Sequence, residues 1–138
     1  MRWSWPPGWI AVWPATTGLW RWYGCPRRRR NKSALGSYAG LCGGVSASGQ
    51  SSADLSITKA GNRRLRTDLV ELAWRTLLYQ PHYYLVKKWK AVLLNPKAHA
   101  RARKRAIIAF ARQLFIDLWR WQTGRRSPEQ LGWVMTEV

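Results

Sequence analysis

Serine hydroxyls and cationic side chains are the reactive groups that this sequence concentrates. Five serines lie in the segment CGGVSASGQSSADLS, namely Ser46, Ser48, Ser51, Ser52 and Ser56. An activated serine hydroxyl is a nucleophile, although most serines in segments of this composition only form turns. The Gly and Ser content predicts an irregular loop with no regular element before Ile57.

Groups that bind metals are sparse. The six carboxylates do not form an arrangement from which a one-metal or two-metal site can be assembled; they are Asp54, Asp68, Glu71, Asp117, Glu129 and Glu137. Cys25 and Cys42 form neither a CxxC pair nor a ligand spacing with histidine, which predicts free thiols in a reducing cytoplasm. His82 and His99 stand apart from acids and cysteines and are expected at the surface or at helix ends. The sequence therefore predicts no metal site in this chain.

The charge balance indicates the class of partner. The 138 residues carry 24 Lys and Arg against 6 Asp and Glu, a formal net charge of +18. Such a surface repels itself unless a polyanion is near, so nucleic acid is the expected partner. The alternatives are an unbound basic surface and a mistranslated reading frame rich in Arg.

Residues 1–30 form a separate segment rich in Trp, Pro and Arg. Pro6, Pro7 and Gly8 interrupt its apolar run, which excludes an export signal and a membrane span. Its tryptophans follow neither a strand period nor a helix period. We expect this segment to be poorly ordered or the product of a shifted reading frame. Its aromatic rings could also stack on single-stranded bases beside the basic run at 27–30.

Helical periodicity begins near Lys32. A short helix or turn is predicted over 33–41, and a long helix is predicted between Asn62, its N-cap, and Pro81. That helix buries Leu65, Leu69, Leu72 and Leu77. A second helix carries Leu85, Trp89 and Val92 on one side.

The last strong helix is predicted from about Arg101 to Thr123, with Gly124 as its stop. Its apolar stripe consists of Ile107, Phe110, Ala111, Leu114, Leu118 and Trp121. No alternation typical of strands persists outside the Trp-rich segment. We predict a mainly α fold, in which a small helical domain over 31–124 with a Gly/Ser-rich active-site-like loop follows the poorly ordered segment and precedes a tail over 125–138.

Two basic clusters stand at the beginnings of predicted helices. Arg63, Arg64 and Arg66 follow Gly61, where guanidinium groups and backbone amides could converge on a phosphate. The first turns of the last helix carry four cations, Arg101, Arg103, Lys104 and Arg105. Positive charges at a helix N-terminus oppose the macrodipole, so an anion such as a phosphate backbone would stabilise them. A solvated helix face explains either cluster equally well. No helix has the pattern that reads base edges.

An ordered set of motifs resembles a known family. SYAGL, SASG, ITKAGNRRLR and RKRAIIAFARQLFIDLWRW occur in the order found in the C-terminal domain of the insertion sequence 110, 116 and 902 transposases. The resemblance covers roughly Arg30 to Trp121. It departs from the family at Gly43, where a proline is common, and at Ala47, where a polar residue often precedes the serine.

The resemblance implies a composite recombinase. In the family, a RuvC-like domain with a DEDD acidic cluster binds a divalent metal such as Mg²⁺, the C-terminal domain supplies a serine, and a structured RNA guides the pair, which acts as a homo-oligomer in the cytoplasm. The position that matches this serine is Ser48. Its hydroxyl would attack a DNA phosphodiester, with Lys59, Arg63, Arg64 and Arg66 balancing the developing charge and Gly40, Gly49 and Gly61 shaping the loop.

The expected function is therefore that of a transposase fragment that carries the serine, lacks the acidic domain and is inactive alone. We expect no cofactor in this chain, DNA as its partner, possible contact with a guide RNA, and no membrane. The two alternatives are a non-enzymatic basic nucleic-acid-binding protein and a degenerate reading frame without function.

Overall fold

A computed structural model describes residues 3–4, 32–41, 43–48, 51–57, 61, 63–134 and 136–137. For the strands over 43–57 it describes the backbone and not the side chains. The predictions for Gly49, Lys59, Asn62, both cysteines and nearly all of the segment over 1–30 lie outside the described residues.

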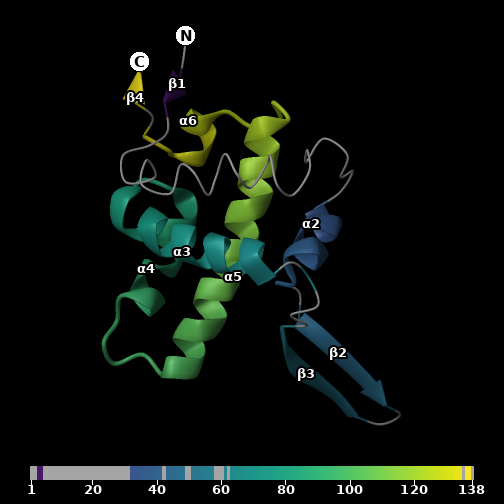
Figure 1. Cartoon of the computed structure of the whole chain (residues 1–138). Helices are drawn as coiled ribbons and strands as arrows, with labels where there is room; N and C mark the ends of the chain where they lie inside the picture. Colours follow the sequence, from purple (N-terminus) through teal and green to yellow (C-terminus); the bar gives the residue numbers. More distant parts are fainter. Residues whose placement is uncertain are drawn as a thin grey trace.

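The helices pack around one long central helix, as the mainly α prediction required. This helix, α5 (Ala100–Gln122), contacts α2 (Lys32–Ala39), α3 (Arg63–Tyr79) and α4 (Tyr84–Leu93). Figure 1 shows α3 crossing α5 near its middle, with α2 to one side and α4 to the other. The predicted stripe of α5 faces this core, because Ile107, Phe110, Ala111, Leu114 and Leu118 are all buried.

The predicted faces of the two preceding helices are also confirmed. Leu65, Leu69, Leu72 and Leu77 of α3 are buried, and α3 ends at Tyr79, before Pro81. In α4, Leu85 is buried, while Trp89 and Val92 are partly buried against the core. None of the helices in the described part of the chain is long and apolar enough to cross a membrane.

Local caps fix both ends of α5. His99 is the N-cap, and its Nδ1 accepts a hydrogen bond from the backbone amide of Arg101 at 3.2 Å. Gly124 takes φ +71°, and the backbone amide of Arg125 donates to the carbonyl of Arg120 at 2.8 Å. This left-handed ending satisfies carbonyl groups that the helix leaves open. The predicted stop at Gly124 is therefore correct.

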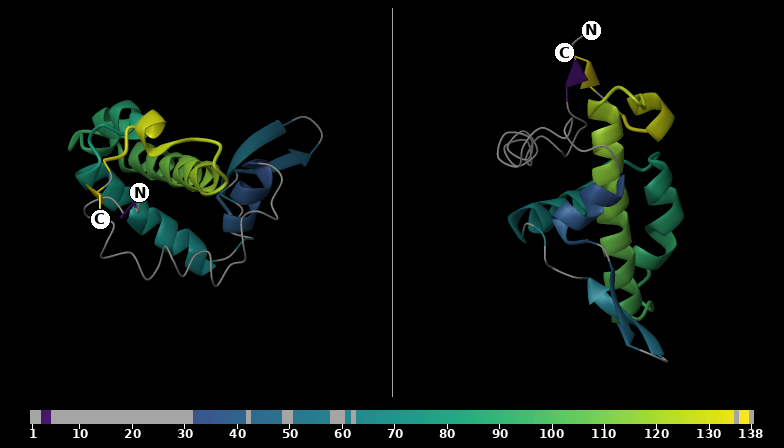
Figure 2. Two further views of the ribbon diagram at one scale, coloured as in Figure 1. Left: turned by 90° about the horizontal axis from the view of Figure 1, so that it is seen from above. Right: turned by 90° about the vertical axis from the view of Figure 1, so that its right-hand side faces the viewer.

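The segment after α2 differs from its prediction. Instead of an irregular loop, β2 (Gly43–Ser48) and β3 (Ser51–Ile57) form an antiparallel hairpin, with Gly43 paired to Ile57 and Ser48 paired to Ser51. Figures 1 and 2 show the hairpin projecting away from the helices. A hairpin is held by backbone hydrogen bonds, which serine and glycine supply as well as other residues do. The sequence did not reveal it because strand propensity and alternation are both weak in this segment.

The residues expected to form a tail pack against the core. The short helix α6 (Pro128–Leu131) begins with a capping box between Ser127 and Gln130. Leu131 and Trp133 are buried, and the side-chain amide of Gln80 bonds to both the N–H and the C=O of Val134. After these residues, β4 (Thr136–Glu137) pairs with β1 (Trp3–Ser4).

Candidate functional site

Two of the predicted loop glycines meet where the chain leaves α2 and enters α3. Gly40 ends α2 with φ +67°, and a Cβ added to it would stand 2.8 Å from the backbone nitrogen of Gly61 and 2.6 Å from Nη1 of Arg66. A Cβ on Gly61 would collide with the backbone of Tyr38 and Gly40. Only residues without a side chain allow this approach. The two glycines thus set the spacing between the base of the hairpin and the start of α3.

Arg66 has a structural partner at this junction. Its Nη1 donates to the carbonyl of Ala39, in the last turn of α2, at 3.4 Å. A cation at a helix C-terminus is favourable because it complements the macrodipole. Arg66 therefore helps to hold α2 against α3, and it is half-buried.

Arg63 and Arg64 differ from Arg66 because both are exposed at the first turn of α3. Arg64 interacts with Asp68 one turn later. Partial burial raises the pKa of the Asp68 carboxyl, Arg64 opposes this rise, and Glu71 adds to it. Arg63 and Arg64 form the part of this cluster that remains open to a ligand.

The hairpin separates Ser48 from this cluster. Gly43 and Ile57 pair at the end of the hairpin next to α2, whereas Ser48 is the last residue of β2 and pairs with Ser51 beside the connection between the strands. The strand β2 has six residues, and the five steps from Gly43 to Ser48 advance by roughly 17 Å at the usual rise of a strand. The structure therefore brings Gly40, Gly61 and Arg66 together and places Ser48 at the opposite end of the hairpin.

The second basic cluster occupies the first turns of α5. Arg101, Lys104 and Arg105 are exposed, and Arg103 is half-buried. In Figure 1 the first turns of α5 and the hairpin extend toward the same end of the molecule. The right-hand view of Figure 2 shows the same relation. A nucleic acid bound at this end would meet the basic turns and the hairpin that carries Ser48.

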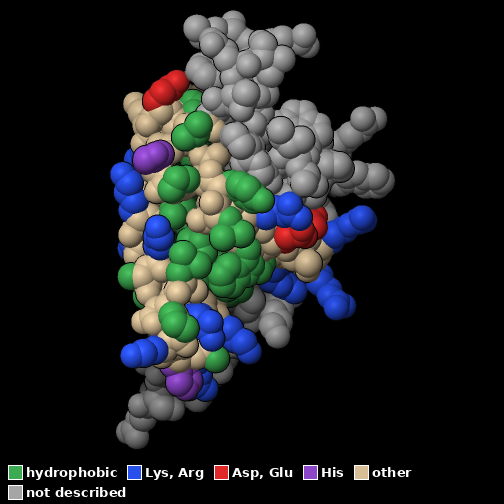
Figure 3. All heavy atoms as spheres, turned by 90° about the vertical axis from the view of Figure 1, so that its left-hand side faces the viewer, with side chains coloured by type: hydrophobic (Ala, Val, Ile, Leu, Met, Phe, Trp, Pro, Cys, Tyr) green, Lys and Arg blue, Asp and Glu red, His purple; other side chains and the backbone are tan. Residues whose placement is uncertain are grey.

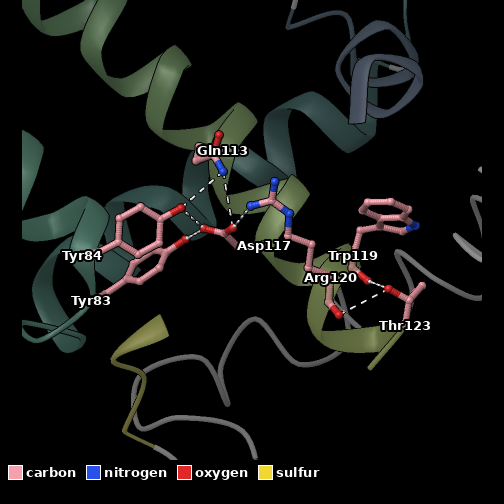
Figure 4. A network of polar contacts seen from close by, with 7 residues as sticks. All are labelled: Tyr83, Tyr84, Gln113, Asp117, Trp119, Arg120 and Thr123. Carbon is pink, nitrogen blue, oxygen red and sulfur yellow. Dashed lines mark hydrogen bonds and ion pairs between the residues drawn. The ribbon is translucent and has the colours of Figure 1, made fainter. Parts of the chain in front are cut away.

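The sequence did not reveal a buried polar network between α4 and α5. The Asp117 carboxylate is fully buried and accepts hydrogen bonds from the Tyr83 hydroxyl at 2.5 Å and the Tyr84 hydroxyl at 2.6 Å. Gln113 and Arg120 each donate to its other oxygen at 3.4 Å. Figure 4 shows the four side chains converging on Asp117. A buried charge requires such partners, because desolvating it alone would be strongly unfavourable.

The network controls the titration of both tyrosines. Burial, followed by the hydrogen bond from its hydroxyl to Asp117, raises the pKa of Tyr84 to about 12. Burial and the charge of Asp117 likewise raise the pKa of Tyr83 well above its usual value. Both phenols are therefore protonated donors and not activated nucleophiles. The sequence signal was the position of Asp117, which lies seven residues after Phe110 and so falls on the apolar stripe of α5.

No carboxylate set suitable for Mg²⁺ is present among the described residues. No group of three or more His, Cys, Asp or Glu side chains lies close enough there to hold a metal ion. The Asp117 carboxylate accepts hydrogen bonds from Tyr83, Tyr84 and Gln113, and it forms an ion pair with Arg120. These described residues do not fit the metal site that the resemblance implies, and His99 serves as a helix cap.

Comparison with known proteins identifies the family. Residues 15–86, just over half of the chain, match the family described as "Transposase IS116/IS110/IS902 family". The chain belongs to this family. The matched range contains α2, the hairpin and α3; it starts earlier than the resemblance noted above and ends within α4.

A longer relative agrees with this assignment. The chain is 35% identical over 98 residues to the "Putative transposase y4rJ" of Sinorhizobium fredii. The aligned region covers 71% of this chain and 24% of the relative. The chain thus spans about a quarter of that relative's length. No solved structure matches the chain.

Proposed function

We propose that this chain is the serine-bearing, DNA-binding part of a transposase and that Ser48 is its nucleophile. The observation that carries the proposal is the position of Ser48 at the outer end of a projecting hairpin, within the range that matches the transposase family. A nucleophile at the end of a hairpin can reach a DNA strand lying along the basic end of the molecule. Ser56, near the other end of the hairpin, lacks this reach. Ser51 pairs with Ser48 at the outer end, and the match to the family's serine is what selects Ser48 between them.

The proposed reaction conserves the number of phosphodiester bonds. The Ser48 hydroxyl attacks a DNA phosphorus atom, an Oγ–P bond forms, and the bond to one deoxyribose oxygen breaks. The Ser48 hydroxyl gives up its proton as the Oγ–P bond forms, and the departing deoxyribose oxygen takes up a proton and becomes a free hydroxyl. Attack by a hydroxyl of another strand on the phosphoserine reverses the step and joins the new strands, so the bond energy is retained.

The charge that develops on the phosphoryl oxygens requires stabilisation. Ser48 lies at the far end of the hairpin from Arg63 and Arg64 in this chain, so we assign these two arginines and the α5 cluster to binding the flanking phosphates. The carboxylates that would hold Mg²⁺ belong, in this proposal, to a separate acidic domain. A guide RNA and a second copy of the chain complete the proposed cytoplasmic assembly.

Binding through phosphates has a simple signature. Each phosphate that a Lys or Arg neutralises releases counterions, so affinity for DNA should fall steeply between low and moderate salt. Fluorescence anisotropy with a labelled duplex measures this slope. An affinity that does not change with salt would contradict phosphate binding.

Strand exchange in a reconstituted system tests the nucleophile. The chain is mixed with the acidic domain of a full-length relative, its guide RNA, Mg²⁺ and donor and target DNA. Ser48→Ala should abolish the covalent protein–DNA adduct and strand exchange while duplex binding persists. Ser46→Ala is the matched control, because Ser46 lies in the same strand two residues away, and it should retain the adduct.

The opposite outcomes are informative. An adduct that persists in Ser48→Ala, or that disappears only in Ser46→Ala, would show that the nucleophile lies elsewhere. DNA binding without any adduct in the complete system would favour a non-enzymatic nucleic-acid-binding protein. An unmodified chain that neither binds DNA nor forms the adduct in the complete system would overturn the proposed function altogether.

A further inference from the structure

An open groove separates the end of α4 from the first turns of α5. Its volume is about 560 Å³, within the range of roughly 300–1,000 Å³ that is typical of small-molecule sites. Helix α4 contributes Trp89 and Val92, and α5 contributes Ala102, Ala106, Arg101 and Arg105. The groove therefore has largely apolar walls, and two arginines are among the residues that line it.

The spacing of these residues explains why the groove is open. Arg101 and Arg105 are one turn apart, are exposed and both line the groove. Alanines at 102, 106 and 109 leave space where larger side chains of α5 would meet α4. Trp89 fills only part of that space.

The indole of Trp89 is held in place and remains partly accessible. Lys88 Nζ lies 5.2 Å from the centroid of its ring, a cation–π contact that orients the indole and adds positive charge beside the groove. Trp89 is half-buried. Among the described residues that line the groove there is no carboxylate. Figure 3 shows one face of the molecule, on which hydrophobic side chains gather near the middle with Lys and Arg side chains around them.

An apolar wall beside two arginines is suited to a ligand that has both a flat apolar ring and negative charge. An aromatic and aliphatic wall accommodates a flat nucleobase, and the two guanidinium groups match the phosphates on either side of it. A base inside a double helix is already stacked and paired and cannot enter the groove. An acidic peptide would use the arginines and leave the apolar wall unoccupied.

We infer that this groove binds an unpaired nucleotide of single-stranded DNA, with its base against Trp89 and its phosphates on Arg101 and Arg105. The inference rests on the proposed function, in which individual DNA strands are cut and rejoined. It goes further in giving α5 a role in distinguishing single strands from duplex. Arg101 and Arg105 then bind both forms, and Trp89 acts on the single strand alone.

Binding of matched oligonucleotides to the whole chain tests the inference. Trp89→Leu removes the aromatic surface and keeps an apolar side chain, so it should weaken binding of a single-stranded DNA roughly tenfold and leave duplex binding unchanged. Trp89→Tyr should restore most of that affinity. Ala102→Leu fills the groove without changing charge or removing the indole, and it should have the same selective effect.

The arginines require a charge-matched control. Arg101→Ala should weaken binding of both DNA forms and reduce the salt dependence. Arg126→Ala removes the same charge from an exposed position beyond the other end of α5, and it should weaken single-strand binding less than Arg101→Ala does. An oligonucleotide with abasic sites should bind the unmodified chain as weakly as the intact strand binds Trp89→Leu.

Three results would overturn the inference. These are an equal loss for single strand and duplex in Trp89→Leu, no effect of abasic sites, and a Trp89 effect confined to RNA of the same sequence. Each of them leaves the proposed function standing if the Ser48 adduct still forms. Loss of the adduct in the complete system, with selective single-strand binding intact, would overturn the proposed function and not the groove.

Discussion

Replacing Asp117 with alanine should destabilise the fold more than replacing any other carboxylate in the described part of the chain. The carboxylate accepts the Tyr83 and Tyr84 hydroxyls at 2.5 and 2.6 Å, and Tyr83 is fully buried. A hydrogen bond to a charged group contributes about 1.5–3 kcal/mol, and an orphaned buried hydroxyl costs about 1–3 kcal/mol. These effects overlap, so we expect the free energy of unfolding to fall by about 3–5 kcal/mol.

The measurement is denaturant unfolding followed by circular dichroism, together with a thermal scan. For a chain of this size, the loss corresponds to a Tm lower by roughly 10–15 °C. Glu71→Ala is the matched control, because Glu71 also pairs with an arginine on its own helix, Arg75 at 3.1 Å, but is exposed. An exposed pair of this kind contributes less than about 1 kcal/mol. A double-mutant cycle between Tyr83→Phe and Asp117→Asn should show a coupling of at least about 1 kcal/mol.

Equal unfolding free energies for Asp117→Ala and Glu71→Ala would contradict a stabilising role for the buried network. That result would mean that the network does not hold α4 against α5. A coupling of zero in the cycle would refute the direct contact between the Tyr83 hydroxyl and the carboxylate. Both outcomes are independent of any activity of the chain.

Three further predictions concern the fold. Gly61→Ala should lower the free energy of unfolding by more than Gly124→Ala does, because the new methyl group at Gly61 meets the backbone of α2. At Gly124 there is open space, so the substitution costs only the left-handed φ, about 1–2 kcal/mol. Equal losses in chemical denaturation would contradict the close approach of Gly61 to α2. Because the pKa of Tyr84 is raised from about 10 in the unfolded chain to about 12 in the folded one, the protonated phenol favours the folded state. Its contribution is complete below about pH 10 and is lost as the pH rises through about 12, so the unfolding midpoint should fall over that window, and Tyr84→Phe should reduce the fall. Trp133→Ala should lower the unfolding free energy by about 3–5 kcal/mol, since the indole is buried against Tyr83 and Trp121, and unchanged stability would show that residues after 124 are dispensable.

The helices were predictable because their information is local. The stripe from Ile107 to Leu118 repeats with the helical period, and Gly124 can adopt the left-handed backbone that ends α5. The start of α3 after Asn62 and its end before Pro81 follow from the same kind of signal. Periodicity and end signals of this kind are read from neighbouring residues alone.

The hairpin and the buried network depend on contacts that the sequence does not display. The pairing of Gly43 with Ile57 joins residues with no alternating pattern between them. Asp117 lies on the apolar stripe, but its partners Tyr83 and Tyr84 are more than thirty residues away in the chain. Only packing of α4 against α5 brings them together. Gly40 and Gly61 likewise lie on either side of the hairpin in the sequence and meet only in the folded chain.

The residue types of the candidate site could be predicted from the sequence, whereas the distance between Ser48 and the arginines could not. The family resemblance selected Ser48, which the structure places at the outer end of β2. It also grouped Ser48 with Arg63, Arg64 and Arg66, but the length of the hairpin separates them, and Arg66 bonds to α2. A strand that projects a residue away from its sequence neighbours cannot be recognised when the segment is read as a loop.

Peptide mass spectrometry can locate the covalent protein–DNA bond and so test whether Ser48 is the nucleophile. The complete reconstituted system is stopped during strand exchange, the DNA is digested to a single nucleotide, and the modified peptide is sequenced. We expect a nucleotide attached through phosphate to the Oγ of Ser48 and to no other residue. A nucleotide on Ser46, Ser56 or either tyrosine of the Asp117 network would contradict it.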